Sequence, residues 1–360
     1  MAKQFYPSVT PEIVRLVGQI DTFKGAWPAI ERAIAPDQLN ALRQTAFIES
    51  VGAGTRLDGL LLSDKDVSRL MATRPAWSFR TSGERKAAGY AEAWEASVRT
   101  SVPEPFTEDF IRQRHRDLFK YGKSPHPLGE YKRAPHMLTG FDPEDDTPAE
   151  PIRTATPKET PKRMREIVGW INQNFNNPQF HPLLTIPVFV ATFLAINPFD
   201  DGNGRLSRLL TLVLLRRAGY GYMSYSSLDR AVEQERDKYV REIRGALVSL
   251  DRSKTPNYKP WTVFLLRALE TQARNLHQLA APKAGSEAEQ EHQERLRELP
   301  ELSARIVTFI NAHGRGDMGG LILDTGVSRN TLKVHLRKLL AKGVIVKHGE
   351  GRGVWYTLPR

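Results

Sequence analysis

The sequence predicts a mainly α-helical protein, in which a helical bundle carries a projecting β-hairpin and is followed by a small separate domain at the C terminus. Three observations support this fold class. Apolar residues recur at helical spacing through most of the 360 residues, and alternating runs are few. A segment rich in Pro, Gly and Asp, GFDPEDDTPAE, interrupts the helical pattern. A polar, charged stretch precedes the last sixty residues.

The helical bundle is expected from segments whose apolar residues repeat at positions i, i+3, i+4 and i+7, the pattern of a helix with one buried face. No internal repeat of fixed period is present. The predicted helices are Leu39–Ser50, Lys86–Arg99, Thr107–Tyr121, Pro161–Phe175, Pro187–Ile196, Arg205–Ala218, Asp229–Ser249 and Trp261–Leu279.

Two short extended segments, Tyr131–Thr139 and Pro151–Thr156, flank GFDPEDDTPAE and predict a projecting hairpin. The stretch Ala281–Leu299 is small, polar and charged, which is typical of a linker. The expected regions are an N-terminal helical region over residues 1–110, a core over 111–280 with the hairpin at 131–156, a linker at 281–299, and a terminal domain over 300–360.

The composition fits a folded globular chain, with 40% hydrophobic and 26% charged residues. The longest apolar stretch, Ile186–Ile196, is too short to cross a bilayer, and no membrane association is expected. The absence of cysteine excludes disulfides and thiolate metal sites and is compatible with a reducing cytoplasm. Because no apolar block follows a basic N-terminal end, the cytoplasm is the expected location.

The net charge of +11 at pH 7 favours an anionic partner, such as a nucleotide, a nucleic acid or an acidic protein surface. More than half of this excess lies in the last sixty residues, where ten Lys and Arg face four Asp and Glu. The basic charge is therefore concentrated in the terminal domain.

The segment Asn197–Arg205, NPFDDGNGR, lies between an apolar helix and a second helix. A helix therefore begins just after a glycine-bearing loop, where backbone N–H groups and the helix dipole favour an anion such as phosphate. Arg205 and Arg208, on the first turn, add positive charge at the same place. Asp201 can hold a magnesium ion that bridges phosphate oxygens. For a motif as short as GNG alone, a capped loop between two core helices is the alternative.

The longer string NPFDDGNGRLSR resembles the signature of the Fic family, HPFxDGNGRxxR, at every fixed position except the first. The resemblance extends from roughly Thr45 to Leu247. Within it, GEYKRAPHM and RTATPKETPKRM resemble the family's flap hairpin and the start of its next helix. The segment Asp237–Tyr239 resembles the family's Arg/Asp-x-Tyr-Tyr segment, with Val240 at the second tyrosine.

This resemblance implies a protein adenylyltransferase that transfers AMP from ATP to a Ser, Thr or Tyr hydroxyl of a target protein, with ATP and Mg²⁺ as its cofactors. It implies that Asp201 holds magnesium and that Asn197 occupies the position of the general-base histidine. It also implies that the target docks on the flap, although the acidic loop Asp142–Glu150 can instead be a solvated turn. The residues implied in nucleotide binding are Phe199, Asp200, Gly202, Asn203, Gly204, Arg205, Arg208 and Tyr239.

Asparagine at position 197 changes the expected chemistry. A histidine has a pKa near neutrality and suits proton transfer, whereas the Asn197 amide can hydrogen-bond a hydroxyl but cannot accept its proton. We therefore expect binding of ATP and magnesium with weak or no turnover. The alternatives are a nucleotide-sensing regulator that binds DNA through the terminal domain, and an interaction protein that uses neither site. The intact Asp201, Asn203, Arg205 and Arg208 argue against the latter.

An N-terminal segment within residues 45–60, IESVGAGTRLDGL, resembles the family's inhibitory helix, whose pattern is Ser/Thr-x-x-x-Glu-Gly. Asp58 occupies the glutamate position, Gly54 the Ser/Thr position, and Gly59 matches. In the family this glutamate pairs with the second arginine of the motif and obstructs the γ-phosphate. The resemblance therefore implies an inhibitory contact between Asp58 and Arg208, while a capping or solvated acid is the alternative.

The last sixty residues predict helix, helix, helix and β-hairpin, an order that resembles a winged helix-turn-helix. Gly326 supplies the turn and Ser328 is a suitable N-cap for the third helix. Lys347 and Arg352 would lie on the wing. This order predicts contact with DNA, or alternatively a protein-docking module. The outer face of the third helix would present Arg329, Asn330, Lys333 and Arg337.

Three isolated histidines, His115, His126 and His181, lack the spacing of metal ligands. We expect them to be structural or surface residues rather than replacement bases. The sequence leaves the oligomeric state open, and a homodimer is one of the states it allows.

Overall fold

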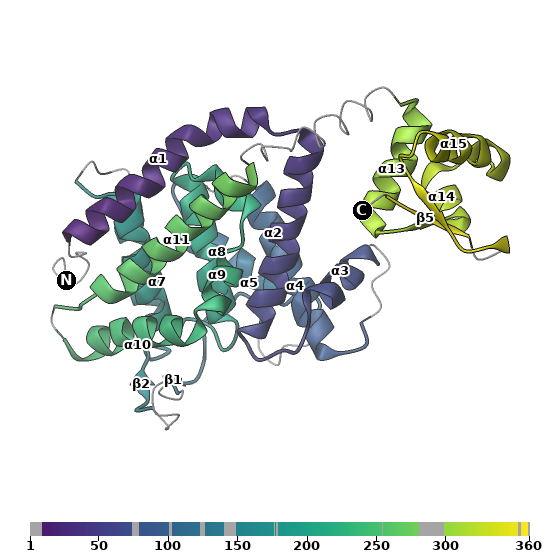
Figure 1. The fold of residues 1–360 in the computed structure, drawn as a ribbon. Helices are drawn as coiled ribbons and strands as arrows, with labels where there is room; N and C mark the ends of the chain where they lie inside the picture. The colour runs from purple at the N-terminus through teal and green to yellow at the C-terminus, as the bar shows by residue number, and fades with distance from the viewer. Residues whose placement is uncertain are drawn as a thin grey trace. The chain divides into compact units, whose positions relative to one another are not determined.

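The computed structural model describes residues 9–73, 79–100, 103–122, 127–139, 149–175, 177, 179–253, 255–280, 299–351 and 354–358. The chain divides into two compact units, Met1–Ala281 and Pro282–Arg360. In the described part of the chain, helices predominate and a short antiparallel hairpin projects from the first unit (Figure 1). The predicted mainly helical fold with a β-hairpin is therefore confirmed.

The first unit packs its helices around one large hydrophobic core. The centre of this core is formed by α7 and α8, whose residues are buried almost throughout. Other helices of the unit pack against both, so the loop that joins α7 to α8 is held between two buried helices. The elements are α1 (Pro11–Ala33), α2 (Pro36–Arg56), α3 (Asp64–Ala72), α4 (Ser82–Arg99), α5 (Glu108–Leu118), α6 (Thr160–Phe175), α7 (Pro182–Ile196), α8 (Asn203–Arg217), η2 (Gly221–Tyr225), α9 (Leu228–Gln234), α10 (Arg236–Arg252) and α11 (Lys259–Ala280).

Side-chain caps define where several of these helices begin. Ser63 and Thr81 each form a capping box, in which the hydroxyl accepts a backbone N–H and an acid three residues later bonds back to the cap. Thr10 caps α1 directly before Pro11, a residue whose fixed φ suits the first helical position. These local signals supply hydrogen bonds to N–H groups that the helix itself cannot satisfy.

The predicted helices are present, and the structure differs from the prediction in four respects. Helix α1 was not predicted, because Gly18, Gly25 and Pro28 weaken its helical signal. Helix α7 begins at Pro182, five residues before its predicted start, and Pro187 lies inside it. The predicted helix Asp229–Ser249 is two helices, α9 and α10, which meet at Glu235 with φ −117° and ψ 41°. The short helix α3 was also not predicted.

The hairpin consists of β1 (Met137–Leu138) and β2 (Ile152–Arg153), paired antiparallel with Met137 opposite Arg153. Residues 140–148, which include most of the acidic loop, lie outside the described residues. The segment before β1 is fixed to the centre of the unit, because the backbone N–H of Lys132 donates to the carbonyl of Pro198 at 2.8 Å. The hairpin therefore adjoins the loop between α7 and α8.

The second unit contains α13 (Glu301–His313), α14 (Met318–Thr325) and α15 (Arg329–Ala341). Its strands β3 (Gly316–Asp317), β5 (Trp355–Thr357) and β4 (Val346–His348) form an antiparallel sheet in that order. The unit has its own apolar core, which includes Leu321 and Leu336. Among the residues that the structure describes in both units, no helix combines the length and apolar character needed to span a membrane.

Candidate active site

The loop between α7 and α8 has two residues in the left-handed region. Asn197 ends α7 with φ 49° and ψ 62°, and it is the non-glycine residue with positive φ in the described part of the chain. Gly202, with φ 80°, precedes α8, and a Cβ there would lie 2.8 Å from Phe119 Cε2. Asparagine is one of the few side chains that tolerate this conformation, while both φ and space require glycine at position 202.

Asn203 forms side-chain hydrogen bonds to the backbone within the loop. Its Oδ1 accepts the backbone N–H of Phe199 at 3.0 Å, and its Nδ2 donates to the Phe199 carbonyl at 2.7 Å. Both residues are buried, so these bonds are shielded from water. Asn203 therefore acts here as the internal brace of the loop, with its amide already committed to the backbone.

His115 of α5 supports the loop from the other side. Its ring stacks on Phe199 with centroids 4.0 Å apart, its Nδ1 accepts the N–H of Gly129 at 3.1 Å, and its Nε2 lies 3.2 Å from the Asp201 carbonyl. These partners assign the proton to Nε2. Burial lowers the pKa of His115 to about 4, so the ring is neutral at pH 7.

This arrangement agrees with the expectation that His115 is structural. His181 is also structural, since it lies before α7, accepts the N–H of Leu183 at 3.2 Å and contacts Asp21 at 2.8 Å. His126 lies outside the described residues.

Arg205, on the first turn of α8, is almost fully buried, at 1% exposure. Its Nε lies 2.5 Å from Asp58 Oδ2, and its NH2 lies 4.0 Å from Asp201 Oδ2. Among the described residues, Nε, NH1 and NH2 form no hydrogen bond of acceptable geometry, even though the Asp58 oxygen is close to Nε. The guanidinium thus has an ion-pair partner but retains unsatisfied donors, which are costly when buried.

Arg208, one turn later on α8, has hydrogen-bond partners that Arg205 lacks. Its Nε donates to Asp229 Oδ1 at 2.6 Å and its NH2 to the Gly54 carbonyl at 3.0 Å. Tyr90 donates its hydroxyl to the second oxygen of Asp229 at 2.8 Å. Burial opposes the charge of Arg208, but Asp229, Tyr90, Tyr239 and Asp58 together outweigh burial, and the pKa of Arg208 lies above its ordinary value. Sequence reasoning missed Tyr90 and Asp229, because no local motif marks them.

Asp58 follows α2 in a tight turn that aims it at the motif. The N–H of Leu60 donates to the Thr55 carbonyl and that of Gly59 to the Arg56 carbonyl, at 3.2 and 2.9 Å, while Gly59 has φ 84°. This is the Schellman pattern, in which glycine supplies the left-handed residue.

The carboxylate of Asp58 lies nearer to Arg205, at 2.5 Å, than to Arg208, at 3.7 Å. The expected contact with Arg208 is therefore the longer of two, because Asp229 already occupies the near side of that arginine. A Cβ at Gly54 would lie 2.1 Å from Tyr90 Cε1, so the tyrosine ring fills the space of a serine or threonine side chain.

Asp201 and Asp200 lie at the mouth of the loop. The Asp201 side chain is 61% exposed and its Oδ1 accepts the Gly202 N–H at 2.6 Å, whereas Asp200 Oδ1 contacts His136 Nε2 at 3.3 Å. Both line a cavity of about 600 Å³ whose wall also includes Arg85, Lys86 and Arg133.

This donor set fits magnesium, which is commonly held by one or two carboxylates together with water and substrate phosphates. It does not form an all-protein cage, since no group of three or more acidic or histidine side chains suited to a metal occurs in the described part of the chain.

Two further residues lie near this loop. The sequence analysis named Tyr239 but not Lys132. Tyr239 of α10 packs against Trp261 and Phe264, and burial raises its pKa while its hydroxyl interacts with Arg208. Lys132 is buried, and its Nζ donates to the carbonyl of Ile196 at 2.9 Å and to Thr154 Oγ1 at 2.8 Å. Burial lowers the pKa of Lys132 to about 8. Lys132 thus ties the hairpin to the residue that precedes Asn197.

The loop and its flanking helices lie in the part of the chain that matches a known protein family. A model of the Fic/DOC family matches residues 105–215. The protein adenylyltransferase Fic of Drosophila willistoni is 23% identical over 208 residues, which are 57% of this chain and 39% of that protein. The chain thus spans about two fifths of the length of this curated relative.

Among solved structures, a Fic family protein from Desulfovibrio desulfuricans G20 superposes with a TM-score of 0.66 at 20% identity, over 99% of this chain and 98% of the other. A Fic domain containing signalling protein from Bacteroides thetaiotaomicron superposes with a TM-score of 0.61 at 20% identity, over 73% of this chain and 96% of the other. These two similarities establish the fold. Residues 105–215 of the chain, which contain the loop, α7 and most of α8, thus match the Fic/DOC family.

Proposed function

We propose that the chain binds ATP and magnesium at the loop between α7 and α8, as a Fic-type protein adenylyltransferase whose transfer step is weak or absent. The proposal rests mainly on Arg205. Its guanidinium is buried at the N terminus of α8 and has unsatisfied hydrogen-bond donors. The first N–H groups of α8 also lack acceptors within the helix, and the helix dipole adds positive potential. Phosphate oxygens supply the acceptors that both sets of donors require.

The proposed reaction forms a bond between a hydroxyl oxygen of the target protein and the α-phosphorus of ATP, while the bond to the β-phosphate oxygen breaks and pyrophosphate leaves. Magnesium held by Asp201 would neutralise negative charge on the phosphates. The backbone of α8 and Arg205 would orient the phosphates, and the exposed edge of β1 and β2 would align an extended target segment by strand addition.

The hydroxyl proton also requires an acceptor, and Asn197 cannot supply one. This missing role is the reason for proposing weak transfer rather than full activity. Histidine tolerates the left-handed conformation that Asn197 adopts, so Asn197→His is compatible with the loop.

Binding is tested first, by calorimetry with ATP and magnesium. We expect saturable binding that Arg205→Ala weakens. Arg69→Ala is the matched control, because Arg69 is an exposed arginine on α3 paired with Asp66. Undetectable binding at millimolar nucleotide, or equal binding by the Arg205 variant, would refute the phosphate site.

Transfer is tested with ATP labelled at the α-phosphate. Asn197→His is expected to raise labelling of a protein hydroxyl by ~10²-fold or more, the usual contribution of a positioned general base. Adding Asp201→Ala should abolish the gain. If the histidine variant binds ATP but labels nothing in a cell lysate, with Asp58 also replaced, then the adenylyltransferase proposal is wrong.

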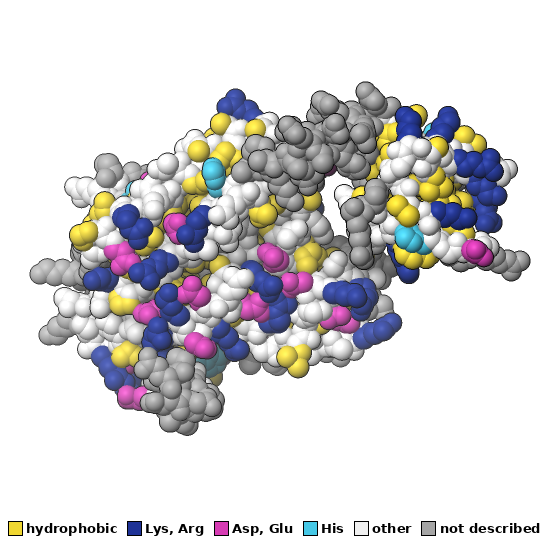
Figure 2. Space-filling model, in the orientation of Figure 1, with side chains coloured by type: hydrophobic (Ala, Val, Ile, Leu, Met, Phe, Trp, Pro, Cys, Tyr) yellow, Lys and Arg dark blue, Asp and Glu magenta, His cyan; other side chains and the backbone are white. Residues whose placement is uncertain are grey.

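A second candidate function concerns the second unit, which we propose to be a winged helix that binds DNA. Four polar or basic side chains are exposed along α15, while Leu332, Leu336 and Leu339 on its other face are buried. Lys and Arg side chains gather on the visible surface of this unit (Figure 2). The exposed residues are Arg329, Asn330, Lys333 and Arg337.

Binding of duplex DNA by the full chain should weaken steeply with salt, because basic side chains displace counterions from phosphate. Lys333→Ala and Arg337→Ala should each weaken it. Arg305→Ala is the control, since Arg305 lies on α13 and donates to the Asp324 carbonyl. Equal retention of all variants in a gel-shift assay at low salt would favour the protein-docking alternative.

A further inference from the structure

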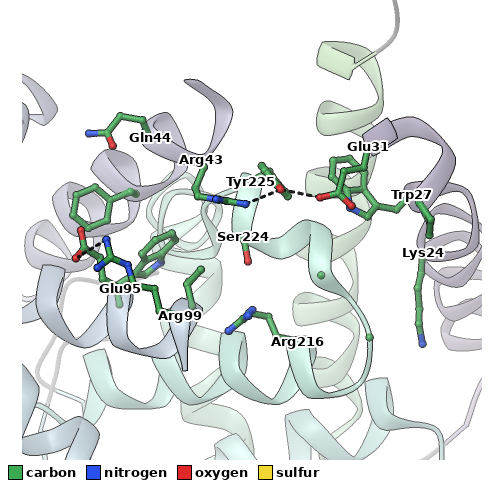
Figure 3. A pocket seen from close by; sticks show the side chains of 16 residues that line it. Lys24, Trp27, Glu31, Arg43, Gln44, Glu95, Arg99, Arg216, Ser224 and Tyr225 are labelled. Atoms are coloured by element: carbon green, nitrogen blue, oxygen red, sulfur yellow. Dashed lines mark hydrogen bonds and ion pairs between the residues drawn. The ribbon is translucent and has the colours of Figure 1, made fainter. Parts of the chain in front are cut away.

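A second cavity of the first unit, of about 580 Å³, lies at the C-terminal end of α8 (Figure 3). Its walls come from α1, α2, α4, α8 and η2. Helix α8 has 15 residues, so its two ends are roughly 22 Å apart at 1.5 Å per residue. This cavity is therefore distinct from the loop that begins α8.

Two arginines from different helices face this cavity without a carboxylate partner. Arg43 of α2 donates to the hydroxyl of Tyr225 at 2.8 Å, and that hydroxyl donates to Glu31 at 2.8 Å. Arg216 of α8 donates to the carbonyl of Ser97. Within the described residues, neither guanidinium has an acidic side chain within ion-pair distance.

The two arginines also affect one another. Burial, and then the charge of Arg43, lower the pKa of Arg216, with no carboxylate acting in the opposite direction. A half-buried cation that is desolvated and next to a like charge is destabilised, and the attraction of an anion placed between the two guanidinium groups would offset both effects.

The remainder of the wall is mixed, with a group of aromatic rings beside polar and charged side chains that include the acids Glu31 and Glu95. Trp27, Phe47, Trp94 and Tyr225 line the cavity, and their rings are part of the hydrophobic core. Such walls exclude water from one side of a ligand and accommodate a flat apolar body, while the arginines fix its charged end.

From these observations we infer that the cavity between Arg43 and Arg216 is a binding site for a small organic anion, a carboxylate or phosphate monoester attached to a flat apolar group. Because Arg43 belongs to α2 and Arg216 to α8, the bound anion would bridge these two helices. Arg99, at the rim, is 78% exposed and lies 3.7 Å from Glu95, so it has an acidic partner and is not part of the anion site.

The inference is tested by calorimetry on the full chain at low salt with four probes. Benzoate and phenyl phosphate carry both a ring and an anionic group, phenol carries only the ring, and inorganic phosphate only the anion. We expect the first two to bind at least ~10-fold more tightly than the last two, a difference of ~1.4 kcal/mol. Phenol binding as tightly as benzoate would overturn the anion site, and inorganic phosphate binding as tightly as phenyl phosphate would overturn the apolar part.

The location is tested with matched arginine variants. Arg43→Gln and Arg216→Gln should each weaken benzoate binding at least ~10-fold, whereas Arg99→Gln and Arg205→Ala should leave it unchanged. Arg43 is exposed, so its variant keeps the test valid if Arg216→Gln fails to fold. Loss of binding in Arg205→Ala alone would assign the probe to the phosphate loop, and unchanged binding in both Gln variants would refute the site.

Discussion

At Asn197, the backbone conformation and the proton chemistry of the side chain are separate properties. Its left-handed conformation turns the chain from α7 into the loop, and asparagine is among the residues that adopt this conformation most readily. The loop around it is braced by Asn203 and His115, which do not depend on the side chain at position 197. The shape of the site is thus separable from its capacity to accept a proton.

The neutral state of His115 makes the stability of the first unit depend on pH. The pKa of this histidine is 6.5 for an exposed ring and about 4 in the folded protein. The unfolded chain therefore binds the proton at higher pH, and stability is lost as pH falls from about 6.5 towards 4. The full effect is ~3 kcal/mol, from 1.36 kcal/mol per pKa unit.

Urea unfolding at several pH values between 4 and 7 measures this dependence. His115→Gln should show a smaller loss of unfolding free energy with falling pH than the parent, whereas His277→Gln, at an exposed position of α11, should match the parent. Identical pH dependence in the His115 variant would contradict a buried neutral ring.

Replacing two helical glycines by alanine should change the free energy of unfolding in opposite directions. At Gly54 the new Cβ would lie 2.1 Å from Tyr90 Cε1, so Gly54→Ala should cost ~1–3 kcal/mol through overpacking. At Gly25 nothing lies within 4 Å, so Gly25→Ala should stabilise by ~0.5–1 kcal/mol. Unfolding free energies of the two variants decide this, and a stabilised Gly54→Ala would disprove the close packing of Tyr90.

The turn that follows α2 determines which arginine of the loop motif pairs with Asp58. Because Asp58 is nearest to Arg205, and Arg208 is already held by Asp229, removal of the Asp58 charge should free mainly Arg205. Asp58→Asn preserves the shape of the turn and should raise the affinity for ATP and magnesium by about 5-fold or more.

Calorimetry with a matched variant tests this contact. Asp37→Asn removes an acid from the other end of α2 and should leave ATP affinity unchanged. Equal affinities for the parent and the Asp58 variant would mean that this carboxylate does not compete with phosphate.

The helices that the sequence predicted are those with a single apolar face and few breakers, because periodicity alone reports such a face. Helix α1 contains two glycines and an internal proline, and its stability comes from packing on α11, which local propensity does not encode. The loop motif was also predictable, since its chemistry lies within twelve consecutive residues. Its supports were not, because Tyr90, His115 and Asp229 reach the loop from three different helices.

The whole chain contains two separate hydrophobic cores, one in each unit, and these should determine how it unfolds. Leu210 belongs to the core of the first unit and Leu336 to that of the second, and both are buried. Truncation of a buried leucine to alanine costs ~2–5 kcal/mol. Leu336→Ala should therefore destabilise the second unit, and Leu210→Ala the first.

Differential scanning calorimetry of the full chain measures both effects. We expect two transitions, of which each substitution lowers only one. A single transition that either substitution shifts as a whole would show that the two cores unfold together.

The packing of α1 against α11 has a consequence for synthesis of the chain. Helix α1 leaves the ribosome before α11, the helix on which it packs and which begins at Lys259 (Figure 1). At ~5–20 residues per second, roughly 10 to 45 seconds of translation separate the two helices. During that time the apolar face of α1 is not covered by α11, so the nascent chain offers this face to chaperones until α11 emerges.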